Sequence, residues 1–237
     1  MSDDVPYGVD RGNAGSLFGE AIALTGRRPL LLPALLLLLL LTASNIVVLR
    51  NLPAEGGTPP LAFLLAAIVR VAGVIYLAVV ILRTLVRSDR PRWLPDGALW
   101  LYGLTFVIGV AVQAAVGLAI GDLSGVAGLL LTNVMVTLLL SPLIAWFVAI
   151  AVARPLAWRP SPWSQDFRRW LPALLLWTLL LVTPLAVLHA WIDRRLIEGV
   201  GDMFWPLALF DGALSTLLAT TGLALNAAAY RRVKSAG

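Results

Sequence analysis

Long apolar stretches alternate with short polar segments along almost the entire chain. Each of six stretches has about the 20 residues that an α-helix needs to cross the hydrocarbon core of a bilayer. They are too long for core helices of a soluble domain, and no room remains for a separate globular domain. We therefore predict an all-α polytopic transmembrane bundle of six helices. Its spans lie at residues 30–49, 60–82, 97–120, 125–153, 170–190 and 203–230.

The segments on either side of the spans are short. Residues 1–29 form a cytoplasmic N-terminal segment, in which residues 13–28 are predicted to be a short helix at the membrane interface, because apolar positions gather on one side of it. These positions are Leu17, Phe18, Ala21, Ile22 and Leu24. Residues 1–10 lack the basic start of a signal peptide, so we expect the first apolar stretch to be retained. Residues 231–237 form a short cytoplasmic tail.

Composition agrees with this architecture and excludes several kinds of chemical site. Hydrophobic residues make up 59% of the chain and charged residues only 13%. Since the chain has no cysteine, disulfides, thiolate metal sites and cysteine nucleophiles are excluded. No cofactor motif or metal-ligand spacing is apparent either.

Basic residues mark one side of the predicted bundle. The loops and termini expected on that side hold fourteen of the eighteen Lys and Arg residues, against three on the other side. Because cytoplasmic loops carry the excess of Lys and Arg, both termini are predicted to be cytoplasmic. One lysine against seventeen arginines, with heavy use of Leu, Ala, Gly and Pro, indicates a GC-rich bacterial genome and hence a bacterial inner membrane.

The formal net charge of +5 does not indicate a nucleic-acid partner, because the basic residues lie at helix ends rather than in one patch. The expected partners are membrane lipids. Arginines at the cytoplasmic face are predicted to contact anionic headgroups.

Short sequence repeats suggest three helical hairpins of the same orientation. The tetrapeptide at 92–95 recurs at 169–172, and the hexapeptide at 32–37 recurs at 171–176. Internal duplication explains the repeats. Convergence explains them equally well, since an interfacial tryptophan, a first-turn proline and leucines are what such helices commonly use.

Arg70 is the residue that most needs an explanation, because it stands alone in the apolar stretch 61–82. An arginine near the middle of a membrane helix costs about 2.5 to 3.5 kcal/mol on insertion scales, so it should face a partner, a cavity or a ligand. At about 1.5 Å per residue, Asp211, Gln113 and Asn133 reach a similar depth. We predict a polar layer of these four residues, with Arg70 and Asp211 as an ion pair.

Two interpretations of the polar layer remain open. In the first, Arg70 and Asp211 lock two helices together, while Gln113 and Asn133 add interhelical hydrogen bonds. In the second, Arg70 faces an outward-opening polar cavity and meets an anionic headgroup or solute, because the guanidinium suits phosphate or carboxylate.

Small residues recur at four-residue steps on the predicted helices. One stripe runs through Gly109, Gln113, Gly117 and Gly121, and a second runs from Asn133 through Ser141 to Ala153. Such faces let helices approach closely, so we expect them to converge on the bundle interior. Exposed small-residue faces would support a homo-oligomer or a hetero-oligomer.

Single residues suggest little catalytic chemistry. His189 is predicted to be an interfacial residue at the outer end of the fifth span, away from Arg70 and Asp211. Pro142 and Pro184 can kink their spans, and Ser141 and Thr183 directly precede them. We find no catalytic motif, and we expect the protein not to be an enzyme.

The segments 19–33 and 226–233, together with six spans and cytoplasmic termini, carry a resemblance to a known family. The chain resembles the small bacterial membrane proteins related to the membrane domain of glycerophosphoryl diester phosphodiesterases. The soluble phosphodiesterase domain of some relatives is absent here. The resemblance implies a polytopic inner-membrane protein concerned with envelope or lipid homeostasis.

The expected function is non-enzymatic: binding or transport of a lipid or small amphiphile, or regulation of a membrane partner. The alternative is a structural or assembly subunit of a membrane complex.

Overall fold

The computed structural model describes residues 14–53, 57–120, 126–152 and 170–236, and the regular elements within these ranges are all helical. In chain order they are α1 (Ala14–Thr25), η1 (Arg28–Leu30), α2 (Leu31–Arg50), α3 (Leu61–Val86), α4 (Gly97–Ile120), α5 (Val126–Leu140), η2 (Ser141–Leu143), α6 (Ile144–Val152), α8 (Leu171–Trp177), η3 (Thr178–Val182), α9 (Thr183–Glu198), η4 (Gly201–Met203) and α10 (Phe204–Ala236).

Within these described ranges, six helices, some built from two or three consecutive elements, are long and apolar enough to cross a membrane. The predicted fold class is therefore confirmed. The six candidate spans are Arg28–Arg50, Leu61–Val86, Gly97–Ile120, Val126–Val152, Leu171–Glu198 and Gly201–Arg232.

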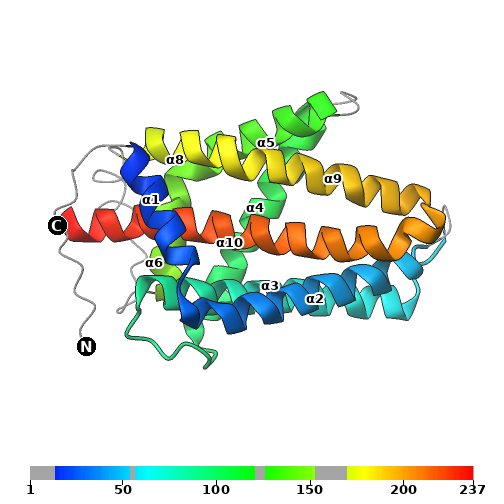
Figure 1. Ribbon diagram of the computed structural model, residues 1–237, viewed down its shortest axis with the longest axis horizontal. Helices are drawn as coiled ribbons and strands as arrows, with labels where there is room; N and C mark the ends of the chain where they lie inside the picture. The colour runs from blue at the N-terminus through cyan, green and yellow to red at the C-terminus, as the bar shows by residue number, and fades with distance from the viewer. Residues whose placement is uncertain (1–13, 54–56, 121–125, 153–169, 237) are drawn as a thin grey trace.

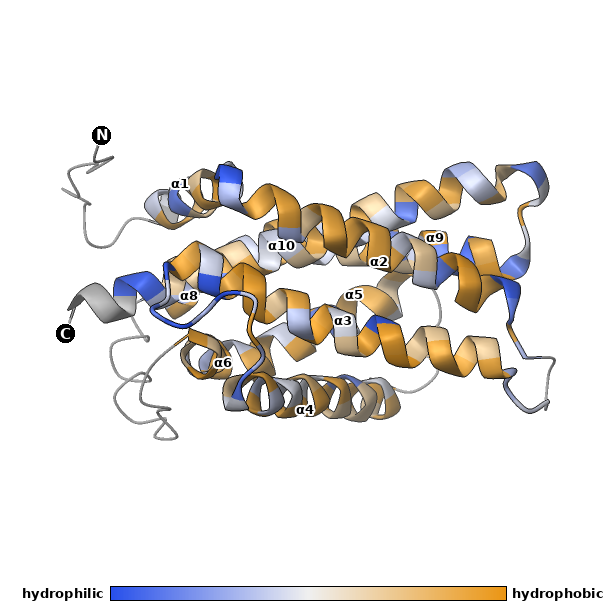
Figure 2. Cartoon of the chain, turned by 90° about the horizontal axis from the view of Figure 1, so that it is seen from below, coloured by the Kyte–Doolittle hydropathy of each residue, from blue (hydrophilic) through white to orange (hydrophobic). Residues whose placement is uncertain are grey.

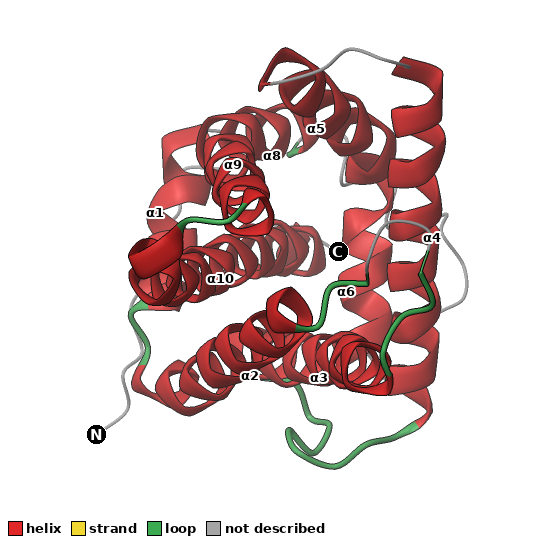
Figure 3. Ribbon diagram, turned by 90° about the vertical axis from the view of Figure 1, so that its right-hand side faces the viewer, coloured by secondary structure: helices red, strands yellow, loops and turns green. Residues whose placement is uncertain are grey.

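Helix α10 is the central element of the bundle. It packs against α2, α3, α6 and α9 along its length and against α1 near its C-terminal end. The end-on view shows α10 between α2 and α9, while α4 stands at the periphery (Figure 3). Helix α4 accordingly has the smallest buried share of the six spans, 11% of its most apolar segment.

Hydrophobic residues cover the middle of the bundle, and hydrophilic residues gather at its two ends (Figure 2). We call the end with α1 and the C-terminus of α10 the basic end, and the opposite end the distal end (Figure 1). The main hydrophobic core lies toward the basic end, where side chains of α3, α6 and α10 such as Ile81, Ala149 and Ala228 are fully buried. Toward the distal end the bundle is more open, since α3 from Leu61 to Ala72 has no fully buried residue.

The short N-terminal helix is present as α1, and it lies across α10 at the basic end (Figure 1). Leu17, Ala21 and Leu24 are buried in the core, whereas Ile22 is exposed. Glu20 forms ion pairs with Arg231 and Arg232 at the end of α10. The apolar side of α1 therefore faces protein, and its place at the membrane interface stays a prediction.

Two of the spans are interrupted next to the prolines singled out in the sequence. The 3₁₀ turn η2 contains Pro142, and Ser141 there donates a hydrogen bond to the carbonyl of Thr137. The π-helical turn η3 ends two residues before Pro184. Both helices continue beyond the interruption because hydrogen bonds of altered register satisfy the backbone around the proline.

Candidate functional site

Four helices bring polar side chains together between about 7 and 17 Å from the distal end, at about 1.5 Å per residue. Helices α2, α3 and α9 contribute one residue each, and α10 contributes two. Hydrogen bonds join them into a continuous chain. We call this group the Asp211 cluster, and its members are Asn45, Arg70, His189, Asp211 and Ser215.

Asn45 links the two charged residues of the predicted layer. Its Nδ2 donates to Oδ2 of Asp211 over 2.8 Å, and its Oδ1 accepts from Nη1 of Arg70 over 3.1 Å. An amide can do both because it carries a donor and an acceptor. Arg70 and Asp211 thus belong to one cluster, as their depth predicted. The expected direct ion pair is replaced by an asparagine bridge.

His189 holds the other oxygen of Asp211. Its Nδ1 lies 2.6 Å from Oδ1 of Asp211 and 3.1 Å from Oγ of Ser215. The side chain of Asp211 is only 1% exposed, and that of His189 is 22% exposed. The expectation that His189 lies at the outer end of its span, away from Arg70 and Asp211, is wrong. Helix α9 runs on to Glu198 and carries His189 down to the level of Asp211.

Close helix packing fixes the position of Asp211. Gly212 faces α2 so closely that a Cβ atom there would lie 2.9 Å from Cβ of Thr42 and 3.1 Å from its Cα. Gly73 of α3 is similarly covered by the side chain of Leu40. Both glycines let α2 approach a neighbour, as small residues do in membrane bundles. The closeness of α2 and α10 places Asn45 within hydrogen-bond reach of Asp211.

Arg70 is the open member of the cluster. It is only partly buried, although it lies well inside a candidate span. A guanidinium has five N–H donors. Among the described residues, Arg70 donates one hydrogen bond, to Asn45. Asp211, by contrast, has both oxygens engaged. The cluster therefore offers unused donors on Arg70, while its carboxylate is already satisfied.

The contacts of His189 are not those of a nucleophilic triad. A Ser–His–Asp relay needs the serine on one ring nitrogen and the aspartate on the other. Here Ser215 and Asp211 both approach Nδ1, and Nε2 has no partner among the described residues. Since a carboxylate only accepts, Nδ1 is the donor toward Asp211 and leaves Nε2 as an acceptor on the neutral ring. The described residues also contain no group of three or more His, Asp or Glu that could hold a metal ion.

Gln113 and Asn133 do not join the Asp211 cluster. Asn133 donates to the carbonyl of Leu129 in its own helix, and Gln113 is exposed on α4. Gly117 is also exposed, and nothing lies within 4 Å of a Cβ built there, while Gly121 is outside the described residues. At Gln113 and Gly117 the stripe on α4 thus faces away from the bundle interior, because α4 is a peripheral helix, whereas Gly109 is half-buried near Leu140 of α5. The second stripe does reach the interior, since Ser141, Ala145 and Ala149 are buried.

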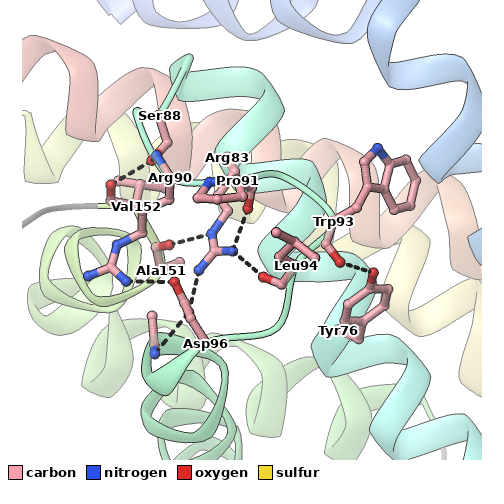
Figure 4. A network of polar contacts seen from close by, with 11 residues as sticks. Tyr76, Arg83, Ser88, Arg90, Pro91, Trp93, Leu94, Asp96, Ala151 and Val152 are labelled. Atoms are coloured by element: carbon pink, nitrogen blue, oxygen red, sulfur yellow. Dashed lines mark hydrogen bonds and ion pairs between the residues drawn. The ribbon is translucent and has the colours of Figure 1, made fainter.

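A second arginine cluster lies near the basic end and serves the fold (Figure 4). Arg83 is 1% exposed and donates to the carbonyls of Ala151, Pro91 and Leu94 and to Oδ1 of Asp96. Ser88 donates to the carbonyl of Val152 in the same cluster. These bonds tie the α3–α4 loop to the end of α6. Arg83 is one of the fourteen basic residues counted on the cytoplasmic side, and the structure buries it.

Asp96 is the carboxylate of that cluster. Its oxygens accept from Arg83 and Arg90 over 2.7 Å each, and Oδ1 also accepts from the backbone N–H of Ala98 at the start of α4. Burial raises the pKa of Asp96, but the hydrogen bonds from Arg90 and Arg83 and their positive charges outweigh burial. The pKa of Asp96 is therefore lowered from the ordinary 3.8.

The fold and the cluster together define a polytopic α-helical membrane protein with a polar cluster inside its spans. Beyond that class, known proteins offer no guide, since no protein-family model, no curated protein and no solved structure matches this chain.

Proposed function

We propose that this protein binds a phosphate- or carboxylate-bearing lipid or small amphiphile at Arg70, and that it stores or moves this ligand without chemical change. The observation that carries the proposal is the partly exposed guanidinium of Arg70, held by Asn45 with its other donors unused. Lipid tails contain no acceptor, so these donors gain a partner only from water or from a ligand.

The rest of the Asp211 cluster supports an anion at this place. Asn45 and His189 occupy both oxygens of Asp211, so the carboxylate holds the cluster together rather than directly covering Arg70. The guanidinium suits the planar, two-pronged geometry of phosphate or carboxylate.

We also propose the orientation and membrane. The excess of arginine at one end of the bundle favours a bacterial inner membrane with the basic end and both termini in the cytoplasm. The Asp211 cluster would then lie in the outer half of the bilayer. A role in lipid or envelope homeostasis agrees with the family that the sequence resembles.

Native mass spectrometry in mild detergent tests the ligand proposal, with phosphatidic acid as the probe and diacylglycerol of the same acyl chains as its phosphate-free control. We expect wild type to retain phosphatidic acid and Arg70→Gln to lose it. Arg70→Lys should retain less than wild type, because an ammonium group cannot donate two parallel hydrogen bonds as a guanidinium does. Arg195→Gln, at an exposed arginine of the distal end that pairs with Glu198, should behave as wild type.

Each variant is first checked for a wild-type helical spectrum and a monodisperse elution profile. Equal retention of phosphatidic acid by folded wild type and folded Arg70→Gln contradicts the proposal. Failure of Arg70→Gln to fold, with no lipid retained by wild type, assigns Arg70 to structure and also contradicts it.

A second candidate function is an assembly subunit, and the lipid-facing side of α4 favours it. Gln113 is exposed within a span and makes no hydrogen bond to any described residue. Gly117, one turn away, is open to a neighbouring helix. Cysteine cross-linking at Gly117→Cys in native membranes tests this function, since a partner on α4 gives a specific adduct that Gln113→Leu weakens.

A further inference from the structure

A depression of about 510 Å³ opens at the distal end, separate from the Asp211 cluster. It lies where the end of α2 meets the connection between α9 and α10. Gly199 and Gly201 adopt positive φ angles of 92° and 53° there, which turns the chain sharply into α10. The lining residues are Arg50, Gly199, Val200, Gly201, Asp202, Phe204 and Trp205.

Aromatic rings hold Arg50 in place within this depression. Its Cζ lies 4.7 Å from the centroid of the Trp205 ring and 5.6 Å from that of Phe204. Stacking on a ring face orients a guanidinium and leaves the N–H groups at its edge free to donate. Arg194 and Arg195 at the same end both pair with Glu198. Arg50 forms no ion pair within the described ranges.

Asp202 brings the opposite charge to the same depression. It is exposed and lines the depression together with Arg50, but the two do not form an ion pair, nor does Asp202 pair with another described residue. Opposite charges that share a small concave surface without meeting leave room for a group between them. A ligand that carries both a negative and a positive charge fits such a surface better than a simple anion, because Asp202 repels an anion.

The depression lies at the ends of two candidate spans, a position that suits contact with lipid headgroups. Arg50 ends the first span, and Trp205 is an exposed tryptophan at the start of the last one. Tryptophan side chains at span ends sit among headgroups. Arg50 is about 7 Å beyond Asn45 along α2, so the depression lies between the distal surface and the level of the Asp211 cluster.

We propose that this depression binds a phosphoethanolamine group, with the phosphate on Arg50 and the ammonium on Asp202. The guanidinium offers paired N–H donors to phosphate oxygens. The carboxylate of Asp202 accepts from the ammonium. The group can come from the headgroup of phosphatidylethanolamine or from a soluble phosphoethanolamine compound.

Native mass spectrometry with an equimolar mixture of phosphatidylethanolamine and phosphatidylglycerol of the same acyl chains tests this site. Wild type should prefer phosphatidylethanolamine. Asp202→Asn should reduce that preference by up to about fivefold, since an exposed ion pair contributes up to about 1 kcal/mol. Arg50→Gln should weaken retention of both lipids, and Arg194→Gln, an arginine of the same end outside the depression, should match wild type.

Added O-phosphoethanolamine identifies the source of the group. Displacement of the retained lipid by this compound shows that the headgroup alone is recognised, and no displacement shows that the whole lipid is needed. Equal lipid preference in wild type and in folded Asp202→Asn and Arg50→Gln overturns the proposal. So does wild type without any preference. Neither result bears on Arg70, whose own test uses different variants and a different probe.

Discussion

Arg70 and Arg83 lie on the same helix, α3, in opposite environments. Arg83 is fully buried and donates four hydrogen bonds, three of them to backbone carbonyls. Arg70 is partly exposed and donates one, to Asn45. A buried charge is tolerated only when its donors are satisfied. Arg83 meets that condition within the protein, and Arg70 meets it only when something else supplies acceptors.

The bridge between Arg70 and Asp211 is open to a direct test at Asn45. Asn45→Ala removes the donor to Oδ2 of Asp211 and the acceptor for Arg70, which should cost about 1 to 3 kcal/mol because buried polar atoms lose their partners. Thermal unfolding in detergent measures the loss. Asn51→Ala is the matched control, because Asn51 only bonds the carbonyl of Val47 in its own helix. A loss as small as that of the control would contradict the bridge.

The ion pairs of Asp96 with Arg83 and Arg90 predict that the folded protein loses stability in acid. Because the pKa of Asp96 is lowered in the folded protein, its contribution to stability is complete above its ordinary pKa of 3.8. That contribution is lost as the pH falls through the lowered folded value. The unfolding temperature of wild type should thus drop more steeply below about pH 4 than that of Asp96→Asn. Asp89→Asn, at an exposed carboxylate of the same loop, should keep the wild-type acid dependence. An unchanged slope in Asp96→Asn would count against the pairing.

Two members of the Asp211 cluster could be predicted from the sequence, and the other three could not. Arg70 and Asp211 stand out because charges inside apolar spans are rare. Asn45 is neutral and lies only about one turn before the end of α2, where polar residues are common. Nothing in the sequence therefore marks it as part of a buried polar cluster. Its value as a donor and acceptor appears only when α2, α3 and α10 are packed together.

At the scale of the helix, the length of α9 explains why the depth of His189 was predicted wrongly, and a π-helical turn before α9 sets the face on which it lies. The turn η3 adds a residue to one turn of the helix before α9. An extra residue rotates everything that follows by about 100° relative to an unbroken α-helix. Spacing along an unbroken helix does not contain this rotation, so the face on which His189 meets Asp211 does not follow from the sequence. The charged residues after His189 also suggested an early end, whereas α9 continues to Glu198.

The contact of α2 with α10 predicts a strong effect of one methyl group. Gly212→Ala places a Cβ atom against Thr42 of α2, so the helices must separate, at about 1 to 3 kcal/mol. Gly222→Ala on the same helix meets nothing within 4 Å and should be neutral or slightly stabilising, since alanine favours helix. Unfolding temperatures of the two variants provide the comparison. Equal temperatures would mean that the close approach at Gly212 is absent.

At the scale of the whole molecule, the span limits follow from hydropathy, while the packing partners of each span do not. The predicted spans lie within four residues of the candidate spans at each end except one, because a bilayer requires a certain helix length. The exception is the fifth, which was predicted to end at residue 190 and continues to Glu198. The small-residue stripe on α4 was expected inside, and it lies outside. Periodicity shows that a helix has a distinct face, but the neighbour of that face depends on how all the helices assemble.

The cysteine-free chain allows a clean test of orientation. Thr58→Cys lies at the distal end and Asp89→Cys at the basic end, and both positions are exposed. With the basic end in the cytoplasm, a membrane-impermeant maleimide should label Thr58→Cys in intact cells and Asp89→Cys only after lysis. Wild type, which has no cysteine, is the background control. The reverse labelling pattern would overturn the orientation.

The central claim is that Arg70 is kept for a ligand rather than for the fold, and the unfolding temperature of Arg70→Met in ligand-free detergent tests it most directly. Methionine keeps the length of the side chain and removes its charge. If Arg70 serves a ligand, we expect the variant to stay within about 1 kcal/mol of wild type, because removing an incompletely satisfied charge from the span offsets the lost bond to Oδ1 of Asn45. A loss of about 3 kcal/mol or more, as for breaking a buried charge pair, would instead show that Arg70 holds the helices together.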